Sequence, residues 1–179
     1  MRHGRAACAA AMAAAMAAAL AAGGCRRPEE TRFLNFDPET TAGHLVSGWS
    51  GWEKTPENDT FVWAQAPEAR MRVTNAGGSD RVVRFRAWSF RYPNAPEQTV
   101  TLSVNGTQID AAGLYREPHV VTFVVPKSIW KNGENEFRFA FAWAETPKDR
   151  IPGSDDSRTL AAAFDWLEIL PPPSTLIRK

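Results

Sequence analysis

Apolar and polar side chains alternate residue by residue in several short segments of this chain. The alternation runs through residues 69–74, 83–87, 99–104, 121–125 and 136–143, with turn residues between the segments. A period of two residues puts successive side chains on opposite faces of a β-strand, and Asn105-Gly106 is a strong signal for a tight hairpin. The pattern predicts antiparallel strands joined by turns, with one hairpin between 69–76 and 82–88 and another at Asn105-Gly106.

The segments on either side of this region are less regular. Residues 33–36, 44–53 and 60–65 are short, aromatic and bounded by Gly, Pro, Asn or Asp, which is typical of strands. Residues 159–170 combine a helix-favouring alanine run with a stretch that is apolar on both faces, and we expect a central strand there. Residues 127–131 are the only segment of the domain for which the sequence predicts a helical turn. We therefore expect an all-β fold, an antiparallel β-sandwich of jelly-roll type with about eight strands.

The N-terminus has the three parts of an export signal. Arg2 and Arg5 precede an Ala-rich apolar run, residues 6–22, which ends in small residues before Cys25. The run is shorter than the roughly 20 strongly apolar residues of a membrane-spanning helix. We expect residues 1–24 to be a signal peptide that is cleaved off.

Cys25 directly follows small residues, and this pattern resembles the lipobox of bacterial lipoproteins. The resemblance implies a diacylglyceryl group on Cys25, with the departure that Ala22 stands where the family usually has leucine. The alternative is ordinary cleavage after Ala19-Leu20-Ala21, which leaves Cys25 as a free thiol. Because an unpaired thiol is a liability in an oxidising compartment, the sequence favours a lipid-anchored protein of the bacterial periplasm or cell surface.

The processed chain has 155 residues, which are the 179 of the whole sequence less the 24 of the signal, and this suits one domain. We divide it into a tether at 25–32, a sandwich domain at 33–171 and a proline-initiated tail at 172–179. Two of the 21 basic residues lie in the signal, which leaves 19 against 20 acidic residues. This balance predicts no nucleic-acid partner and no membrane contact beyond the lipid anchor. A single cysteine excludes an internal disulfide, and no cysteine or histidine motif predicts a metal or other cofactor.

Two stretches of the alternating region carry a family resemblance. VTLSVNGTQI at 100–109 and HVVTFVVPKSIWKNGENEFRFAF at 119–141 resemble the galactose-binding-domain-like jelly rolls found as carbohydrate-binding modules of glycosidases. The resemblance implies that fold and, through it, a carbohydrate partner. In its Gly133-Glu134-Asn135 motif, Gly133 can adopt a positive φ that ends a turn, and Asn135 can hydrogen-bond local backbone. Segments 48–53, 61–64 and 155–166 are similar instead to uncharacterised envelope-associated sandwich domains, which imply no activity.

Aromatic and charged residues near both ends of the domain form the candidate carbohydrate site. Sugar binding needs flat aromatic faces for the ring and polar groups for the hydroxyls, and these residues supply both if the first and last strands are neighbours. The candidates are Trp49, Trp52, Glu53, Trp63, Asp156 and Arg158. The alternative is structural, with Trp49 and Trp52 closing the end of the sandwich and Glu53 pairing with Arg158.

Arginines on the predicted first hairpin form a second candidate. Its natural register places Arg70 near Arg86 and Arg72 near Arg84, and like charges across strands destabilise a sheet. We expect either acidic residues such as Glu136 or an anionic polysaccharide to neutralise them.

Catalysis finds little support in the sequence. His44 and His119 lie in no pattern with Ser or Cys that indicates an activated nucleophile, and the scattered carboxylates predict no specific pair. We predict a non-enzymatic lipoprotein that binds carbohydrate. The alternative is a protein-interaction or structural lipoprotein that docks onto an envelope complex.

Overall fold

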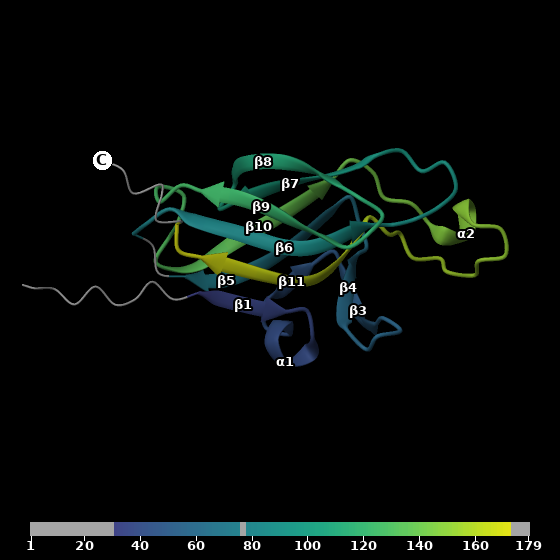
Figure 1. The fold of residues 1–179 in the computed structure, drawn as a ribbon, viewed down its shortest axis with the longest axis horizontal. Helices are drawn as coiled ribbons and strands as arrows, with labels where there is room; N and C mark the ends of the chain where they lie inside the picture. The colour runs from purple at the N-terminus through teal and green to yellow at the C-terminus, as the bar shows by residue number, and fades with distance from the viewer. Residues whose placement is uncertain (1–30, 76–77, 173–179) are drawn as a thin grey trace, which may run out of the picture.

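The structure, a computed structural model, describes residues 31–75 and 78–172 of the chain. The predicted signal peptide, Cys25, most of the tether and most of the tail lie outside the described residues. Within them, eleven strands and two one-turn helices form two antiparallel sheets that pack face to face (Figure 1). The expected antiparallel β-sandwich is confirmed.

The first sheet, sheet A, has six strands and the second, sheet B, has five. Sheet A runs in the order β3 (Trp49–Lys54), β4 (Thr60–Ala64), β11 (Ala162–Leu170), β6 (Arg81–Ser89) and β9 (His119–Val125), and β1 (Arg32–Asn35) also pairs with β11. Sheet B runs in the order β2 (Leu45–Ser47), β5 (Glu68–Asn75), β10 (Gly133–Phe141), β7 (Gln98–Val104) and β8 (Thr107–Leu114). The helices are α1 (Pro38–Thr41) and α2 (Pro147–Arg150). The pairing of β1 with β11 brings the first and last described strands together, which is the condition on which the candidate site depended.

The alternating side chains of both sheets meet in an aromatic core. Phe164 on β11 is fully buried, and its ring centroid lies 5.2 Å from that of Phe85 on β6 and 5.1 Å from that of Phe139 on β10. Since β6 and β11 belong to sheet A and β10 to sheet B, these rings join the two layers. Residues 162–170 therefore form a central strand, as expected, because β11 has β4 and β6 as its neighbours.

Gly48 divides a segment that the sequence treated as one strand. Residues 44–53 form β2 in sheet B and β3 in sheet A, and Gly48 between them has a φ of +76°. A Cβ atom at this position would lie 2.3 Å from the carbonyl oxygen of Glu68, so only glycine allows the backbone to pass here. This crossing is one reason why the structure has more strands than the sequence predicted.

The prediction that residues 69–76 and 82–88 form a hairpin is wrong. Residues 68–75 form β5 in sheet B, which pairs with β10 and β2, whereas β6 lies in sheet A between β11 and β9. The connection between them passes from one sheet to the other. Alternation identified both strands, but it carries no information about which strand each one pairs with.

The Gly133-Glu134-Asn135 motif acts as the sequence indicated. Gly133 has a φ of +94°, and the fully buried Asn135 amide donates to the carbonyl oxygens of Lys131 and Gly133. The Asn135 carbonyl oxygen in turn accepts from the Lys131 amide and from the side chain of Asn105. Residues 127–129 form a hydrogen-bonded turn rather than a helix. The motif fixes this turn between β9 and β10.

The sandwich has two different ends. At one, which we call the terminal end, β1 begins and β11 finishes, because Arg32 is the register partner of Ile169. At the other, the loop end, lie the connections 90–97, 115–118 and 142–161, the last of which carries α2 (Figure 1). The loop end therefore offers the longer irregular segments on which a binding site can be built.

Candidate functional site

Aromatic side chains stand on the solvent side of sheet A near the loop end. Val62 and Ala64 of β4 are fully buried, so the alternating Phe61 and Trp63 point to the opposite, outer face. Trp88 of β6 lies on that face as well, with its ring centroid 5.3 Å from that of Phe61. Edge-to-face packing of Phe61 and Trp63, at 5.9 Å and 82°, fixes the two rings relative to each other.

A charged cluster borders these rings. Arg158 donates from Nε and Nη2 to the Asp156 carboxylate, at 3.0 and 2.7 Å, and from Nη1 to the Glu53 carboxylate. Glu53 is the register partner of Phe61, so it shares the outer face. We call the group of Glu53, Phe61, Trp63, Trp88, Asp156 and Arg158 the Trp63 platform.

The hydrogen bonds between Asp156 and Arg158 keep these two side chains ionised. The hydrogen bonds from Arg158 hold the pKa of Asp156 below its ordinary value of 3.8. The same bonds, to Asp156 first and then to Glu53, raise the pKa of Arg158. All three side chains are about one-third exposed, which leaves lone pairs and N–H groups open to an incoming hydroxyl-rich molecule.

Trp49 and Trp52 do not join the other four predicted site residues. Trp49 is half-buried in the core, with its ring centroid 5.2 Å from Phe164, and its Nε1 donates to the carbonyl oxygen of Arg70. The Trp52 Nε1 donates to the Thr41 hydroxyl of α1, and its ring is 38% exposed. Trp52 is the register partner of the buried Val62, so it lies on the other side of sheet A from Trp63. The structure thus brings together Glu53, Trp63, Asp156 and Arg158 and leaves both of the other tryptophans outside the site.

Phe61 and Trp88 were missed by the sequence analysis, although a signal for Trp88 was available. Trp88 follows Arg84 and Arg86 at a spacing of two, on the polar side of an alternating strand. Phe61 gave no such signal, because residues 61–64 are apolar in both phases, and its side chain is only 9% exposed beneath its aromatic neighbours. An aromatic residue in the polar phase of a strand points outward, and this phase marks it as a candidate for binding rather than for the core.

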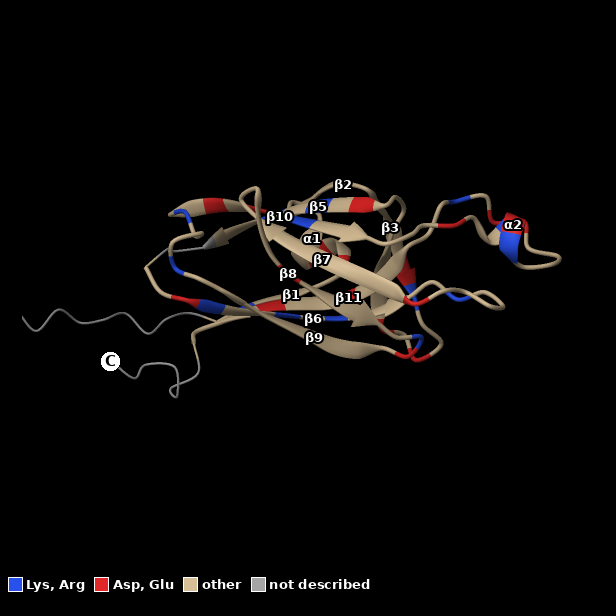
Figure 2. Ribbon diagram, turned by 90° about the horizontal axis from the view of Figure 1, so that it is seen from above, with Lys and Arg blue, Asp and Glu red and all other residues tan. Residues whose placement is uncertain are grey.

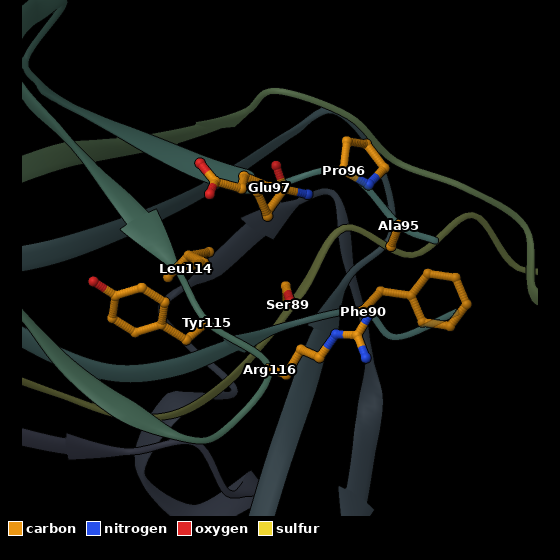
Figure 3. A pocket seen from close by; sticks show the side chains of 9 residues that line it. Ser89, Phe90, Ala95, Pro96, Glu97, Leu114, Tyr115 and Arg116 are labelled. Atoms are coloured by element: carbon orange, nitrogen blue, oxygen red, sulfur yellow. The ribbon is translucent and has the colours of Figure 1, made fainter. Parts of the chain in front are cut away.

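A hollow of about 180 Å³ at the loop end is a second place where a small molecule fits. Figure 3 shows it between the segment after β6 and the end of β8, with Phe90, Glu97, Tyr115 and Arg116 around it. The Tyr115 ring is 69% exposed and lies 4.5 Å from the ring of His119. The hollow is shallow and open, and although the buried polar residues Ser89 and Gln98 line it, the Gln98 amide already donates to the carbonyl oxygens of Trp143 and Ala161. We therefore place the candidate site on the Trp63 platform.

The arginines predicted to face one another do not do so, and each has an acidic partner. Arg70 pairs with Glu68 and with Glu136, at 2.6 and 3.1 Å, which confirms the expected role of Glu136. On the other sheet, Arg84 pairs with Glu168 and Arg86 with Asp165. Burial raises the pKa of Asp165 even though Arg86 pairs with it. No anionic polysaccharide is needed to neutralise these arginines.

The described residues form neither a metal site nor a membrane-spanning helix. No group of three or more His, Cys, Asp and Glu side chains in the described part of the chain is placed to hold a metal ion. None of the helices formed by residues 31–75 and 78–172 has the length and hydropathy to cross a bilayer.

Comparison with known proteins identifies the fold. No family model and no curated protein matches the chain. A family 35 carbohydrate binding module from Clostridium thermocellum aligns with a TM-score of 0.52 and 12% identity, over 80% of this chain and 99% of that one. The GH26-CBM35 β-(1,4)-mannanase of Podospora anserina aligns with a TM-score of 0.51 and 9% identity, over 82% of this chain and 28% of the enzyme. The chain has the jelly-roll β-sandwich fold of carbohydrate-binding modules, as residues 100–109 and 119–141 implied.

Proposed function

We propose that this chain is a non-catalytic carbohydrate-binding lipoprotein of the bacterial periplasm or cell surface, and that the Trp63 platform holds the sugar. One observation carries the proposal: Trp63 and Trp88 lie on the outer face of a sheet and pack on Phe61, whose register partner Glu53 is held by Arg158. The fold shared with carbohydrate-binding modules supports it, and the lipobox-like Cys25 supports the anchor.

The chemistry of the platform suits a sugar. The apolar C–H face of a pyranose packs against an aromatic ring, while its hydroxyls need both hydrogen-bond donors and acceptors. The carboxylates of Glu53 and Asp156 accept hydrogen bonds and the guanidinium of Arg158 donates them. Because ion pairs already order these three side chains, little conformational entropy is lost when a ligand binds.

A glycan array tests the proposal. The described fold begins at residue 31, so a soluble chain starting at residue 26 contains all of it. We expect binding of at least one glycan, and we expect Trp63→Ala to abolish it. Phe33→Ala is the matched control, since Phe33 is an exposed aromatic of the same sheet that lies near the terminal end. If the folded chain binds no neutral or acidic glycan, the proposal is wrong.

A protein partner is the second candidate function. The observation that favours it is the exposure of apolar side chains along sheet A: Phe33 is 54% exposed, Val120 41% and Val124 47%. A photo-crosslinking residue at position 120 in the native host should then give one discrete adduct. The same residue at position 101, on the outer face of sheet B, is the control. Adducts of equal yield from both positions would exclude a specific partner at this face.

The non-catalytic part of the proposal has its own test. We expect no hydrolysis of a panel of chromogenic glycosides. Hydrolysis that is lost in Glu53→Gln or Asp156→Asn would show instead that the platform is an active site.

A further inference from the structure

The terminal end of the sandwich carries cations that the fold leaves unpaired. Lys127 and Lys131 lie in the segment between β9 and β10, and both side chains are exposed. Their backbone amides donate to Asp80 and Asn135, but neither ammonium group has a hydrogen-bond or ion-pair partner among the described residues. The two lysines differ in this respect from Arg70, Arg84 and Arg86 on the outer faces of the sheets, because carboxylates pair with these arginines.

The segment that presents these lysines is rigidly held. Asn105 donates to the carbonyl oxygen of Ile129, and the buried Trp130 donates from Nε1 to the carbonyl oxygen of Val125. Asn135 hydrogen-bonds both the amide and the carbonyl group of Lys131. The backbone that carries the two ammonium groups is therefore fixed, so a flat anionic surface can contact both groups at once.

The balance of basic and acidic residues differs between the two ends of the molecule, although Figure 2 shows that both ends carry both kinds. At the terminal end, Arg32, Lys127 and Lys131 outnumber Asp80, while Glu134 pairs with Arg72. In the loop-end connections 90–97, 115–118 and 142–161, six acidic residues stand against five basic ones. Only the terminal end is therefore complementary to an anionic surface.

The chain enters the fold at this same end. Arg32 is the first residue of β1 there, and it lies seven positions after Cys25 in the sequence. A fully extended chain of that length reaches at most about 25 Å. Any anchor on Cys25 therefore keeps the terminal end close to the membrane, and Arg26 and Arg27, next to Cys25 in the sequence, add two further cations.

We infer that the terminal end rests on the anionic lipid headgroups of the membrane, through Lys127, Lys131 and Arg32, and that the Trp63 platform is thereby turned toward the opposite side. This goes beyond attachment by the lipid alone, and it rests on the anchor at Cys25 that the proposed function includes. Each Lys or Arg near an anionic bilayer contributes about 1 kcal/mol. Three such residues on a tethered domain are enough to select one orientation.

The experiment replaces the native anchor by a chemical one. Without residues 1–24 the chain has one thiol, Cys25, which couples to a maleimide-headgroup lipid in vesicles. Two vesicle types are compared, phosphatidylcholine alone and phosphatidylcholine mixed with phosphatidylglycerol. The rate at which an amine-acetylating reagent modifies each lysine is then measured by mass spectrometry.

We expect Lys127 and Lys131 to be acetylated about fivefold more slowly on anionic vesicles than on neutral ones, with Lys148 on α2 unchanged. High salt, about 0.5 M, should remove the difference because it screens the attraction. In a Lys127→Glu, Lys131→Glu variant, acetylation of Lys148 should be slowed on anionic vesicles instead, or no lysine should differ between the two vesicle types. Lys148→Glu is an equivalent charge change at the far end, and it should leave the slow acetylation of Lys127 and Lys131 on anionic vesicles intact.

Equal rates on both vesicles, or equal slowing of Lys148, would overturn the inference. Because the coupling is chemical, this result is independent of whether the native host acylates Cys25. Absence of palmitate incorporation in the native host would instead defeat the anchor in the proposed function, and a silent glycan array would defeat the sugar site.

Discussion

The outer faces of the two sheets are built from different residues. That of sheet B carries a ladder of ion pairs, in which Glu68 contacts both Arg70 and Arg138, and none of its described strand residues on that side is aromatic. That of sheet A carries Trp63, Trp88 and Phe61 together with its ion pairs. Charged side chains alone are enough to keep a sheet face solvated, so the aromatic rings are the feature of sheet A to which the proposed function assigns ligand binding.

Both faces depend on one shared core, so the largest effect should come from Phe164. Its ring contacts aromatic residues of both sheets and is fully buried. We expect Phe164→Ala to lower the free energy of unfolding by about 3–5 kcal/mol, through lost burial and the cavity left behind. Urea denaturation measures it. A loss below about 1 kcal/mol would mean that the two faces are supported independently.

The second prediction separates the faces by function. We expect Trp88→Ala to weaken binding of the best glycan from the array at least about tenfold, equivalent to about 1.4 kcal/mol. The reason is that its ring completes the platform next to Phe61. Arg138→Ala on sheet B should leave the affinity unchanged. Calorimetric titration of both variants checks this, and equal losses would remove the functional distinction between the faces.

A smaller effect is expected from the sheet B ladder itself. Burial raises the pKa of Glu68, but hydrogen bonds from Arg70 and Arg138 outweigh it, and the net pKa is lowered. These pairs are partly exposed, so we expect Glu68→Gln to lower the free energy of unfolding by only about 0.5–1 kcal/mol. The loss should shrink in high salt. A loss that is insensitive to salt would show that packing, not charge, holds this face.

The smallest change should appear with pH on the sheet A side. The folded pKa of Asp156 lies below its ordinary value of 3.8, so its bond to Arg158 stabilises the fold above that pH. This contribution is lost as the pH falls through the lowered folded value. We expect the stability difference between the native chain and Asp156→Asn to be constant near neutrality and to vanish in strong acid. Denaturation at a series of pH values measures it, and a difference that persists in acid would contradict the ion pair.

The sequence predicted where the strands lie along the chain far better than which strands pair with each other. Alternation located β5, β6, β7, β9 and β10, and Asn105-Gly106 located the hairpin between β7 and β8, because these signals are local. The pairing partners of β5 and β6 could not be found in this way. The connection from Asn75 to Arg81 joins strands of different sheets, but in the sequence it looks like a hairpin turn. The break at Gly48 was also hidden, because the carbonyl oxygen of Glu68 that demands glycine is twenty residues away.

The candidate site was predicted in part for similar reasons. The pairing of Glu53 with Arg158, which the structural alternative expected, is confirmed. Trp49 and Trp63 look alike in the sequence, but one faces the core and the other does not. Their different environments follow from the crossing at Gly48, which changes the direction of the chain just before Trp49.

The place of β11 in the chain has a consequence for assembly. This strand lies between β4 and β6 and also pairs with β1, yet it is the last to be synthesised. Sheet A therefore lacks its middle until residues 162–170 have been synthesised, and most of its contacts join residues that are distant along the chain, which slows folding. In the proposed lipoprotein, this delayed closure would keep the chain unfolded while it passes through a translocon.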